Sequence, residues 1–444
     1  MSIKQPLDKL KSFSTSLARD AETGKATKDT RFMPDLMFSH EDYGSASLSG
    51  DEARTFQEIV ESLYGNLTGL ASKRTIAHLV ERAILKTVDI RHNAPDKSVE
   101  SRATEAVDEV RLALTAKPIN WRCCVPIIGI KPPNETWNIG NIAITHTDRA
   151  DGIDFFGQAE AITDQTLHPA EFKEEMKRQH REQIIAVPGK PQVIALTTVQ
   201  ALDNDAAWDL AKRRIRFVLD CLTYAFNATH GPQYDHYELS DDQPRRHYRV
   251  GLVVNITDHS RLNVPSELVG PLLADADLFR TELSSHPSIG RLIEILSASH
   301  NTEHEERLLN AIHWAGRATN QRRPEESFLY RAIALESLIL GGYGQELTLR
   351  LSLSVTHLLG DRLRDRKMCE SQIKKLYRIR SSIVHDGKYE VDPVDQSRLR
   401  AYLFHCFDRL LADEIFNGMK SKKDLDEWFE CALRGDHRAP PTPS

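Results

Sequence analysis

The chain has no run of eighteen apolar residues, no CxxC pair, and six cysteines among 444 residues. The first absence excludes an ordinary membrane-spanning helix, so no membrane partner is expected. A chain of this size can form its own core without disulfide bonds. The cysteines are therefore predicted to be reduced, mostly buried thiols of a cytoplasmic protein. The polar start MSIKQPLDKLKSFSTS predicts no signal peptide.

Several catalytic and cofactor signatures are also missing. The sequence has no GxSxG, kinase or Rossmann pattern, and the glycine-rich segment at 341–344 lacks the Lys and Ser/Thr of a P-loop. That segment is interpreted as a turn between helices. Histidines gather at 230–236, 245–247 and 300–304, but without HExxH spacing or a cysteine partner. They are predicted to be surface histidines, and no metal or cofactor is expected.

The charge is slightly negative overall and uneven along the chain. A formal net charge of −6 excludes a chain-wide basic field for nucleic acid. Between Asp361 and Arg380, however, eight Lys/Arg stand against three Asp/Glu. Such a run is usually a solvated helix face, and it could equally receive a polyanion.

Hydrophobic periodicity predicts an α+β protein whose mixed helix and strand region is followed by an all-helical bundle. The expected segments are a polar, partly disordered stretch (1–50), a helical segment (51–117), an α+β domain (118–272), a connecting helix (273–302), a helical bundle (303–435) and a flexible tail (436–444). Strands are expected at 121–130, 137–145, 192–199 and 247–257. Helices are expected from 51 to about 70 and at 76–88, 99–114, 203–227, 278–297, 303–318, 324–340, 347–359, 367–385, 396–416 and 424–433.

The segment IRSSIVHDG at 379–387 ends the helix expected at 367–385. Ile373, Leu376, Tyr377 and Val384 fall on one helix face, and Arg380 lies in the middle of it. A half-buried arginine needs a partner. His385 follows, and the Asp-Gly pair at 386–387 predicts the end of the helix. An Arg and a His at a helix end can act together on a phosphodiester, because one binds phosphate charge and the other moves protons near neutral pH.

The C-terminal region resembles the HEPN superfamily, and within it the Apea-like HEPN group. Three segments carry the resemblance: ESFLYRAIALESLIL at 326–340, ELTLRLSLS at 346–354 and IKKLYRIRSSIVHDG at 373–387. The last is similar to the family's Rx4–6H motif in its shortest spacing. The resemblance covers about residues 303–433. It implies a HEPN helical bundle that forms a homodimer.

The resemblance also implies metal-independent cleavage of RNA, tRNA or mRNA, by attack of the ribose 2′-OH on the adjacent phosphate. The products would be a 2′,3′-cyclic phosphate and a 5′-OH. Arg380 would stabilise the phosphate and His385 would be the general acid or base. Catalytic members often have Asn, Asp or His after the arginine, whereas this chain has Ser381. A ribonuclease toxin of prokaryotic anti-phage defence, abortive infection or stress fits that family.

Other residues are candidates for supporting roles. Glu336 could orient Arg380, and Tyr377 lies one turn before it. The basic residues Lys374, Lys375 and Arg378 are candidate RNA contacts. The alternative is that Arg380 pairs structurally with Glu336 while His385 caps the helix. The protein would then be a non-catalytic HEPN dimer that binds RNA, a nucleotide or a partner protein. Residues 1–300 carry no catalytic motif and by analogy could sense a trigger ligand or protein.

Helix geometry sets a condition on the proposed pair. At about 100° per residue, Arg380 and His385 lie roughly 140° apart around an ideal helix. Two arrangements would bring them together. Either the site draws its Arg and His from both subunits, or the helix ends at Val384.

Overall fold

The computed structural model describes residues 3–22, 36–40, 44–48, 50–67, 69–88, 97–146, 193–231, 237–239, 249–250, 253–254, 262–263, 266–267, 273–321, 323–340, 347–360, 362–387 and 390–434. The chain divides into two compact units. The first comprises Met1–Cys123 and Thr198–Lys212, and the second comprises Cys124–Thr197 and Arg213–Ser444. The first unit thus takes in a segment that the sequence analysis assigned to the α+β domain.

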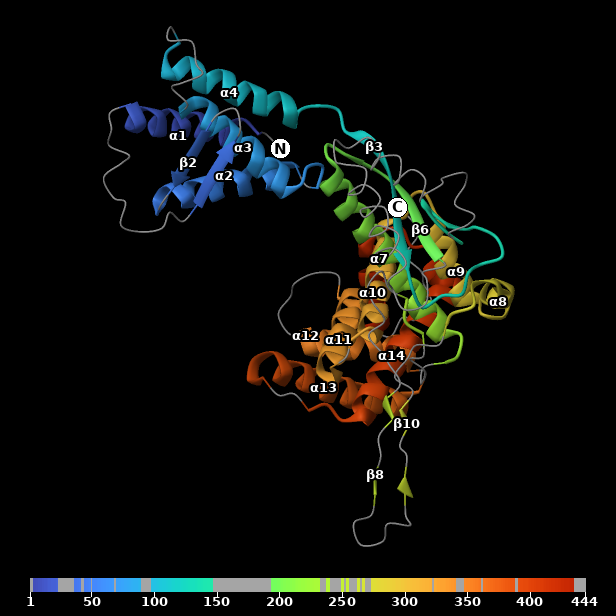
Figure 1. The fold of residues 1–444 in the computed structure, drawn as a ribbon. Coiled ribbons are helices and arrows are strands. Elements are labelled where there is room, and N and C mark those ends of the chain that lie inside the picture. Colours follow the sequence, from blue (N-terminus) through green and yellow to red (C-terminus); the bar gives the residue numbers. More distant parts are fainter. Residues whose placement is uncertain are drawn as a thin grey trace. The chain divides into compact units, whose positions relative to one another are not determined.

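Four helices and a hairpin form most of the first unit (Figure 1). They are α1 (Lys4–Glu22), β1 (Leu36–His40), β2 (Gly44–Leu48), α2 (Asp51–Leu67), α3 (Lys73–Val88) and α4 (Val99–Leu114). The apolar faces of the helices meet in one core that includes Leu10, Ile59, Ile76 and Val107. Helix α1 belongs to that core although the sequence analysis assigned no helix to residues 1–50.

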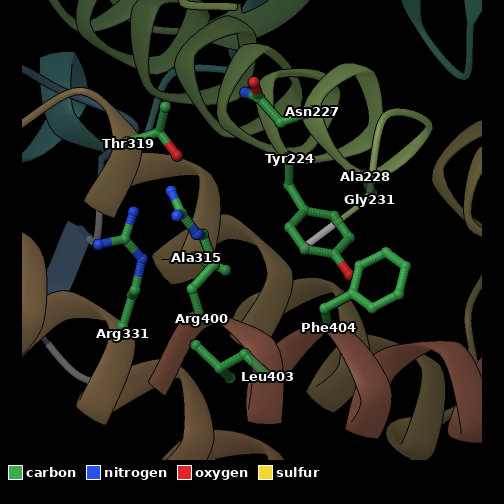
Figure 2. Close-up of a pocket in the computed structure, with 10 residues that line it drawn as sticks. All are labelled: Tyr224, Asn227, Ala228, Gly231, Ala315, Thr319, Arg331, Arg400, Leu403 and Phe404. Atoms are coloured by element: carbon green, nitrogen blue, oxygen red, sulfur yellow. The ribbon is translucent and has the colours of Figure 1, made fainter. Parts of the chain in front are cut away.

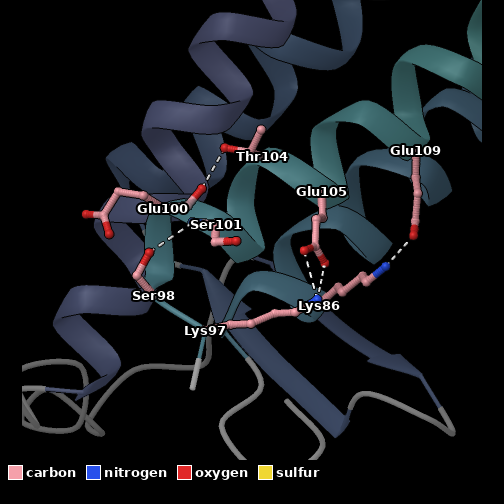
Figure 3. Close-up of polar contacts among 8 residues, drawn as sticks. All are labelled: Lys86, Lys97, Ser98, Glu100, Ser101, Thr104, Glu105 and Glu109. Atoms are coloured by element: carbon pink, nitrogen blue, oxygen red, sulfur yellow. Dashed lines mark hydrogen bonds and ion pairs between the residues drawn. The ribbon is translucent and has the colours of Figure 1, made fainter. Parts of the chain in front are cut away.

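Helix α4 shows how the elements of this unit are fixed locally (Figure 3). The Ser98 hydroxyl accepts a hydrogen bond from the Ser101 backbone N–H, which caps the first turn. The Lys97 ammonium donates to both carboxylate oxygens of Glu105 at 2.8 Å, and Lys86 pairs with Glu109. Pairs this exposed contribute little to stability, so apolar burial on the opposite face holds the helix in place.

A four-stranded sheet has the order β3-β6-β5-β4. Its strands are β3 (Ile119–Ile127), β4 (Trp137–Ile139), β5 (Ile142–His146) and β6 (Val193–Ala201). The strand expected at 137–145 is a hairpin that turns at Gly140, whose φ of 58° favours glycine. Strand β5 runs antiparallel to both β4 and β6. In the second unit, Trp137 packs against Phe226 and Phe279 at ring-centroid distances of 6.4 and 6.0 Å, which joins the sheet to the helices.

The rest of the second unit is helical, with α7 (Asn204–Ala228) entering it at Arg213. Its other helices are α8 (Ala276–Glu282), α9 (Pro287–Ser297), α10 (Glu303–Thr319), α11 (Pro324–Ile339), α12 (Leu347–Leu359), α13 (Leu363–Asp386), α14 (Pro393–Ala412), α15 (Glu414–Asn417) and α16 (Lys422–Leu433). Helices α10 and α11 pack along each other, as do α12 and α13 (Figure 1). The described structure is mostly helical with a small antiparallel sheet, which is compatible with the α+β class.

Three expected elements differ in the structure. The helix at 278–297 is interrupted, because Pro287 cannot continue it and instead begins α9. The helix at 396–416 stops at Ala412, and α15 starts after Asp413. Of the strand expected at 247–257, the structure describes only β7 (Arg249–Val250) and β8 (Val253–Val254), which pair with β10 (Ser266–Glu267) and β9 (Leu262–Asn263) respectively.

The structure also tests the expectations of reduced, mostly buried cysteines and of no membrane-spanning helix. All six cysteines are unpaired, and Cys123, Cys221, Cys369 and Cys406 are buried. No helix in the described ranges is long and apolar enough to span a bilayer. The glycine-rich segment 341–344 and the histidines at 236 and 247 lie outside the described residues.

His304 contradicts the prediction of surface histidines. It lies in the first turn of α10 and is 2% exposed, and its backbone N–H donates to the Lys420 carbonyl ahead of α16. Neither ring nitrogen bonds to another described residue. Burial lowers the pKa of His304 to about 4, and the nearby Arg307 adds to this effect, while Glu305 and Asp424 oppose it. The side chain is therefore held neutral in the folded protein.

This burial predicts a loss of stability on the acid side. An unfolded histidine protonates near pH 6.5, whereas folded His304 resists protonation down to about pH 4. Between these values the unfolded state binds the extra proton. The free energy of unfolding should then fall with decreasing pH by up to about 3 kcal/mol from this residue. Urea unfolding measured from pH 7 to pH 4 gives the free energy of unfolding at each pH. This free energy should change less with pH in His304→Leu than in wild type. His300→Leu, which removes an exposed neighbour, should keep the wild-type profile, and equal profiles for all three proteins would contradict the assignment.

Candidate functional site

Helix α13 carries the IRSSIVHDG segment as one continuous helix. Ile373, Leu376 and Ile383 are buried against the bundle. The expected face included Val384 instead of Ile383, and that detail is wrong, because Val384 is 49% exposed. Beyond Asp386, Gly387 adopts a φ of 63°, and its N–H donates to the Ser382 carbonyl, so the predicted stop is confirmed.

Arg380, Glu336 and Tyr377 form a cluster between α11 and α13, called here the Arg380 cluster. The Arg380 Nε donates to Glu336 Oε1 at 3.0 Å, and the side chains are 27% and 23% exposed. The guanidinium carbon lies 5.9 Å from the centre of the Tyr377 ring. Burial raises the pKa of Tyr377, and its hydrogen bond to Glu336 raises it further, so the phenol stays protonated. Glu336 thus holds both neighbours, and the expected contact with Arg380 is present.

His385 and Ser381 are exposed on the same helix. No other described residue hydrogen-bonds or ion-pairs with the His385 side chain. The helix is closed by the Gly387 backbone, so His385 is not its cap. Because α13 runs to Asp386, the alternative in which it ends at Val384 is wrong. Arg380 and His385 are therefore offset by about 7.5 Å along the helix axis and about 140° around it.

The three candidate RNA contacts differ in their surroundings. The Lys374 ammonium pairs with Glu370 at 2.5 Å, and Lys375 pairs with the buried Asp395 at 2.7 Å. Arg378 donates from Nε to the Lys374 carbonyl at 3.3 Å and is exposed. Glu370 is already included in the count over 361–380, whereas Asp395 lies outside that range and reduces the local excess of positive charge. Among the three, only Arg378 lacks a carboxylate partner within the described residues.

No family model, no curated protein sequence and no solved structure matches this chain. The described residues also contain no group of three or more His, Cys, Asp or Glu side chains arranged to hold a metal ion.

The structure reveals two further polar groups that the sequence analysis did not single out. Arg331 and Arg400 line one cavity of the bundle. The buried Asp220 carboxylate lies 3.1 Å from the His313 Nδ1 between α7 and α10. The sequence does place Arg331 inside the apolar run FLYRAIALE, and an arginine in such a run indicates a buried polar contact. No spacing rule connects Arg400, which is 69 positions away, to that run.

The Arg380 cluster predicts a measurable coupling between its two charges. Arg380→Met and Glu336→Gln should each lower the free energy of unfolding. The double variant should lower it by less than the sum of the two single losses. The coupling energy should be about 0.5–1 kcal/mol, because both groups are about a quarter exposed and solvent screens their attraction. Urea unfolding of the four proteins measures this energy. The control combines Arg378→Met with Glu336→Gln, and the losses in free energy of unfolding of these two variants should add. A coupling energy of zero between Arg380 and Glu336 would contradict their contact.

Proposed function

We propose that the chain is a metal-independent endoribonuclease of the HEPN type, acting as a homodimer on tRNA or mRNA, with a role in prokaryotic antiviral or stress defence. The observation that carries the proposal is the placement of the motif. Arg380 is oriented by Glu336 yet remains partly exposed, and His385 is exposed at the end of the same helix. The all-helical C-terminal region is compatible with a HEPN bundle.

The chemistry needs no metal. His385 as a base would take the proton of a ribose 2′-OH, and the resulting oxygen would attack the adjacent phosphorus. The bond to the 5′-oxygen of the next nucleotide would break, and a protonated group would supply the proton for that leaving group. Arg380 would stabilise the charge on the non-bridging oxygens through its N–H donors. Ser381 offers a hydroxyl beside Arg380 but no charge.

The geometry of α13 supports a site composed from two copies. Since Arg380 and His385 point about 140° apart, a phosphate bound at Arg380 of one copy would meet His385 of the other. The exposed Val384 next to His385 gives that surface an apolar residue that a second copy could cover. In a two-fold symmetric dimer, this arrangement yields two equivalent sites.

A second candidate function rests on the same contact. The Arg380 guanidinium already has a carboxylate partner in Glu336, as in a structural ion pair. The protein would then be a HEPN dimer that binds RNA, a nucleotide or a partner protein without cleaving. In either case residues 1–300 are the proposed region for a trigger ligand or protein.

Incubation of the purified protein with total RNA in EDTA tests the proposal. Wild type should yield fragments with 2′,3′-cyclic phosphate ends. His385→Ala should reduce the rate by at least about 100-fold, because it removes the proton-transfer group. His405→Ala, an exposed histidine on α14, is the matched control and should cleave like wild type. Equal cleavage by wild type and His385→Ala would rule out the assigned role of His385.

Mixing two inactive variants tests whether the site is composite. Arg380→Ala and His385→Ala proteins are unfolded together, refolded and assayed on RNA. If each site takes Arg380 from one copy and His385 from the other, a mixed dimer has one intact site. Activity should then return to about a quarter of wild type, since about half of the dimers are mixed. No recovery, with dimers confirmed by light scattering, would place both groups of a site in one chain.

A further inference from the structure

One face of α10 carries three polar or aromatic side chains that the proposed function does not use. They are His313, Trp314 and Arg317, which fall within about 100° of one another around the helix. Ala315 and Thr319 lie on the opposite side of α10 and line the cavity between α7, α10, α11 and α14 (Figure 2). The three side chains therefore face away from that cavity.

The His313 imidazole is fixed from two sides. Its buried Nδ1 lies 3.1 Å from the Asp220 carboxylate of α7. The Phe217 ring, also on α7, stacks on the imidazole at a centroid distance of 5.0 Å and an interplanar angle of 25°. A carboxylate at one ring nitrogen sets the tautomer and leaves the other nitrogen to a ligand. Within the described ranges no residue bonds to His313 Nε2, and this nitrogen is not buried.

Arg317 follows His313 by one turn and is held by two aromatic rings. Its guanidinium carbon lies 5.4 Å from the centre of the Trp314 ring and 5.2 Å from that of Tyr330 on α11. The two rings stack on each other at 5.4 Å with an interplanar angle of 18°. No described residue accepts a hydrogen bond from the Arg317 guanidinium or forms an ion pair with it, although Asp220 attracts it over a longer distance.

The donors on this face are ordered and available to a ligand. Like the Arg317 guanidinium, the Trp314 Nε1 and the Tyr330 hydroxyl have no hydrogen-bond partner among the described residues, and none of these groups is buried. Residues one turn apart, as His313 and Arg317 are, have Cβ atoms only about 6 Å apart. Because ring contacts already restrict both side chains, little conformational entropy is left to lose on binding.

We propose that this face of α10 binds a nucleotide unit of RNA, with the phosphate at Arg317 and His313 and the base against Trp314 and Tyr330. A guanidinium offers a phosphate a planar fork of donors, and an imidazole adds another donor. Bases stack on aromatic side chains with little dependence on sequence. A simple carboxylate ligand would use the donors but not the aromatic pair. A free nucleotide has the same chemistry as the RNA unit, and the test below separates the two.

This site shares no residue with the Arg380 cluster or with the candidate RNA contacts of α13. The inference rests on the proposed function only for the choice of RNA as the ligand. Since it concerns binding, it can be measured on a protein that does not cleave RNA. A failure of cleavage and a failure of binding at α10 are therefore separate results.

Fluorescence anisotropy of a labelled, short single-stranded RNA, titrated in EDTA with full-length His385→Ala protein, tests the proposal. In this background Arg317→Gln should weaken binding about tenfold or more, because a charge-assisted pair of hydrogen bonds is lost. Arg323→Gln is the matched control. The Arg323 side chain is 68% exposed and pairs with Glu326, so its loss should leave binding within about twofold of the background.

Variants of Tyr330 report on the base and keep the test informative if Arg317→Gln fails to fold. Tyr330→Leu removes the ring and should weaken RNA binding about fivefold or more. Tyr330→Phe keeps the ring and should bind within about twofold of the background. Equal binding by the Leu and Phe variants would rule out stacking at this position.

Adenosine 5′-monophosphate as a competitor identifies the source of the nucleotide unit. Displacement of the label at a lower concentration than unlabelled RNA requires indicates a free nucleotide, and displacement only at a higher concentration indicates RNA. The proposal is overturned if neither ligand binds, or if the Arg317→Gln and Arg323→Gln proteins bind equally.

Discussion

The close approach of α7 and α10 at Gly316 is the constraint on which the second unit depends. A Cβ atom on Gly316 would lie 1.8 Å from the Asp220 carbonyl oxygen and 2.6 Å from its carbon, so no other residue fits there. The two backbones touch at this point. Helix α11 packs along α10, and α14 packs on α11, so the position of α10 fixes the rest of the bundle. The same approach sets Tyr224 and Asn227 of α7 opposite Ala315 and Thr319 of α10 across the cavity.

The Asp220 carboxylate is buried where α7 and α10 meet, and it has polar partners on α10 and at its C-terminal end. Asp220 is 3% exposed, and burial raises its pKa, although His313 at 3.1 Å and Arg317 oppose the shift. The Asn320 amide donates to the other Asp220 oxygen at 3.2 Å. Buried ion pairs of this kind add little net stability over apolar residues of equal size, but an error in register would leave a charge unpaired. Their effect is to favour one arrangement of helices over the alternatives.

The sequence predicted the regular elements well where local rules determine them. Helices α4 and α12 have the expected bounds, because strong apolar periodicity and flanking polar residues define both ends. The contact of Arg380 with Glu336 could be expected from a half-buried arginine that needs a partner. Three properties depend on tertiary packing and could not be read from the chain: the burial of His304, the choice of Ile383 over Val384 for the core, and the convergence of Arg331 with Arg400.

The proposed catalytic role of Arg380 is compatible with a weak ion pair to Glu336. An ion pair with both partners about a quarter exposed contributes only about 1 kcal/mol or less, so Glu336 can orient Arg380 without holding it against a phosphate. A bidentate contact with phosphate is stronger than the single Nε bond seen here. Tyr377 shares the Glu336 carboxylate, which limits how far that carboxylate can follow the guanidinium. Under the proposed mechanism, Arg380 would exchange a weak partner for a stronger one, and His385 would approach from a different direction because α13 stays helical to Asp386.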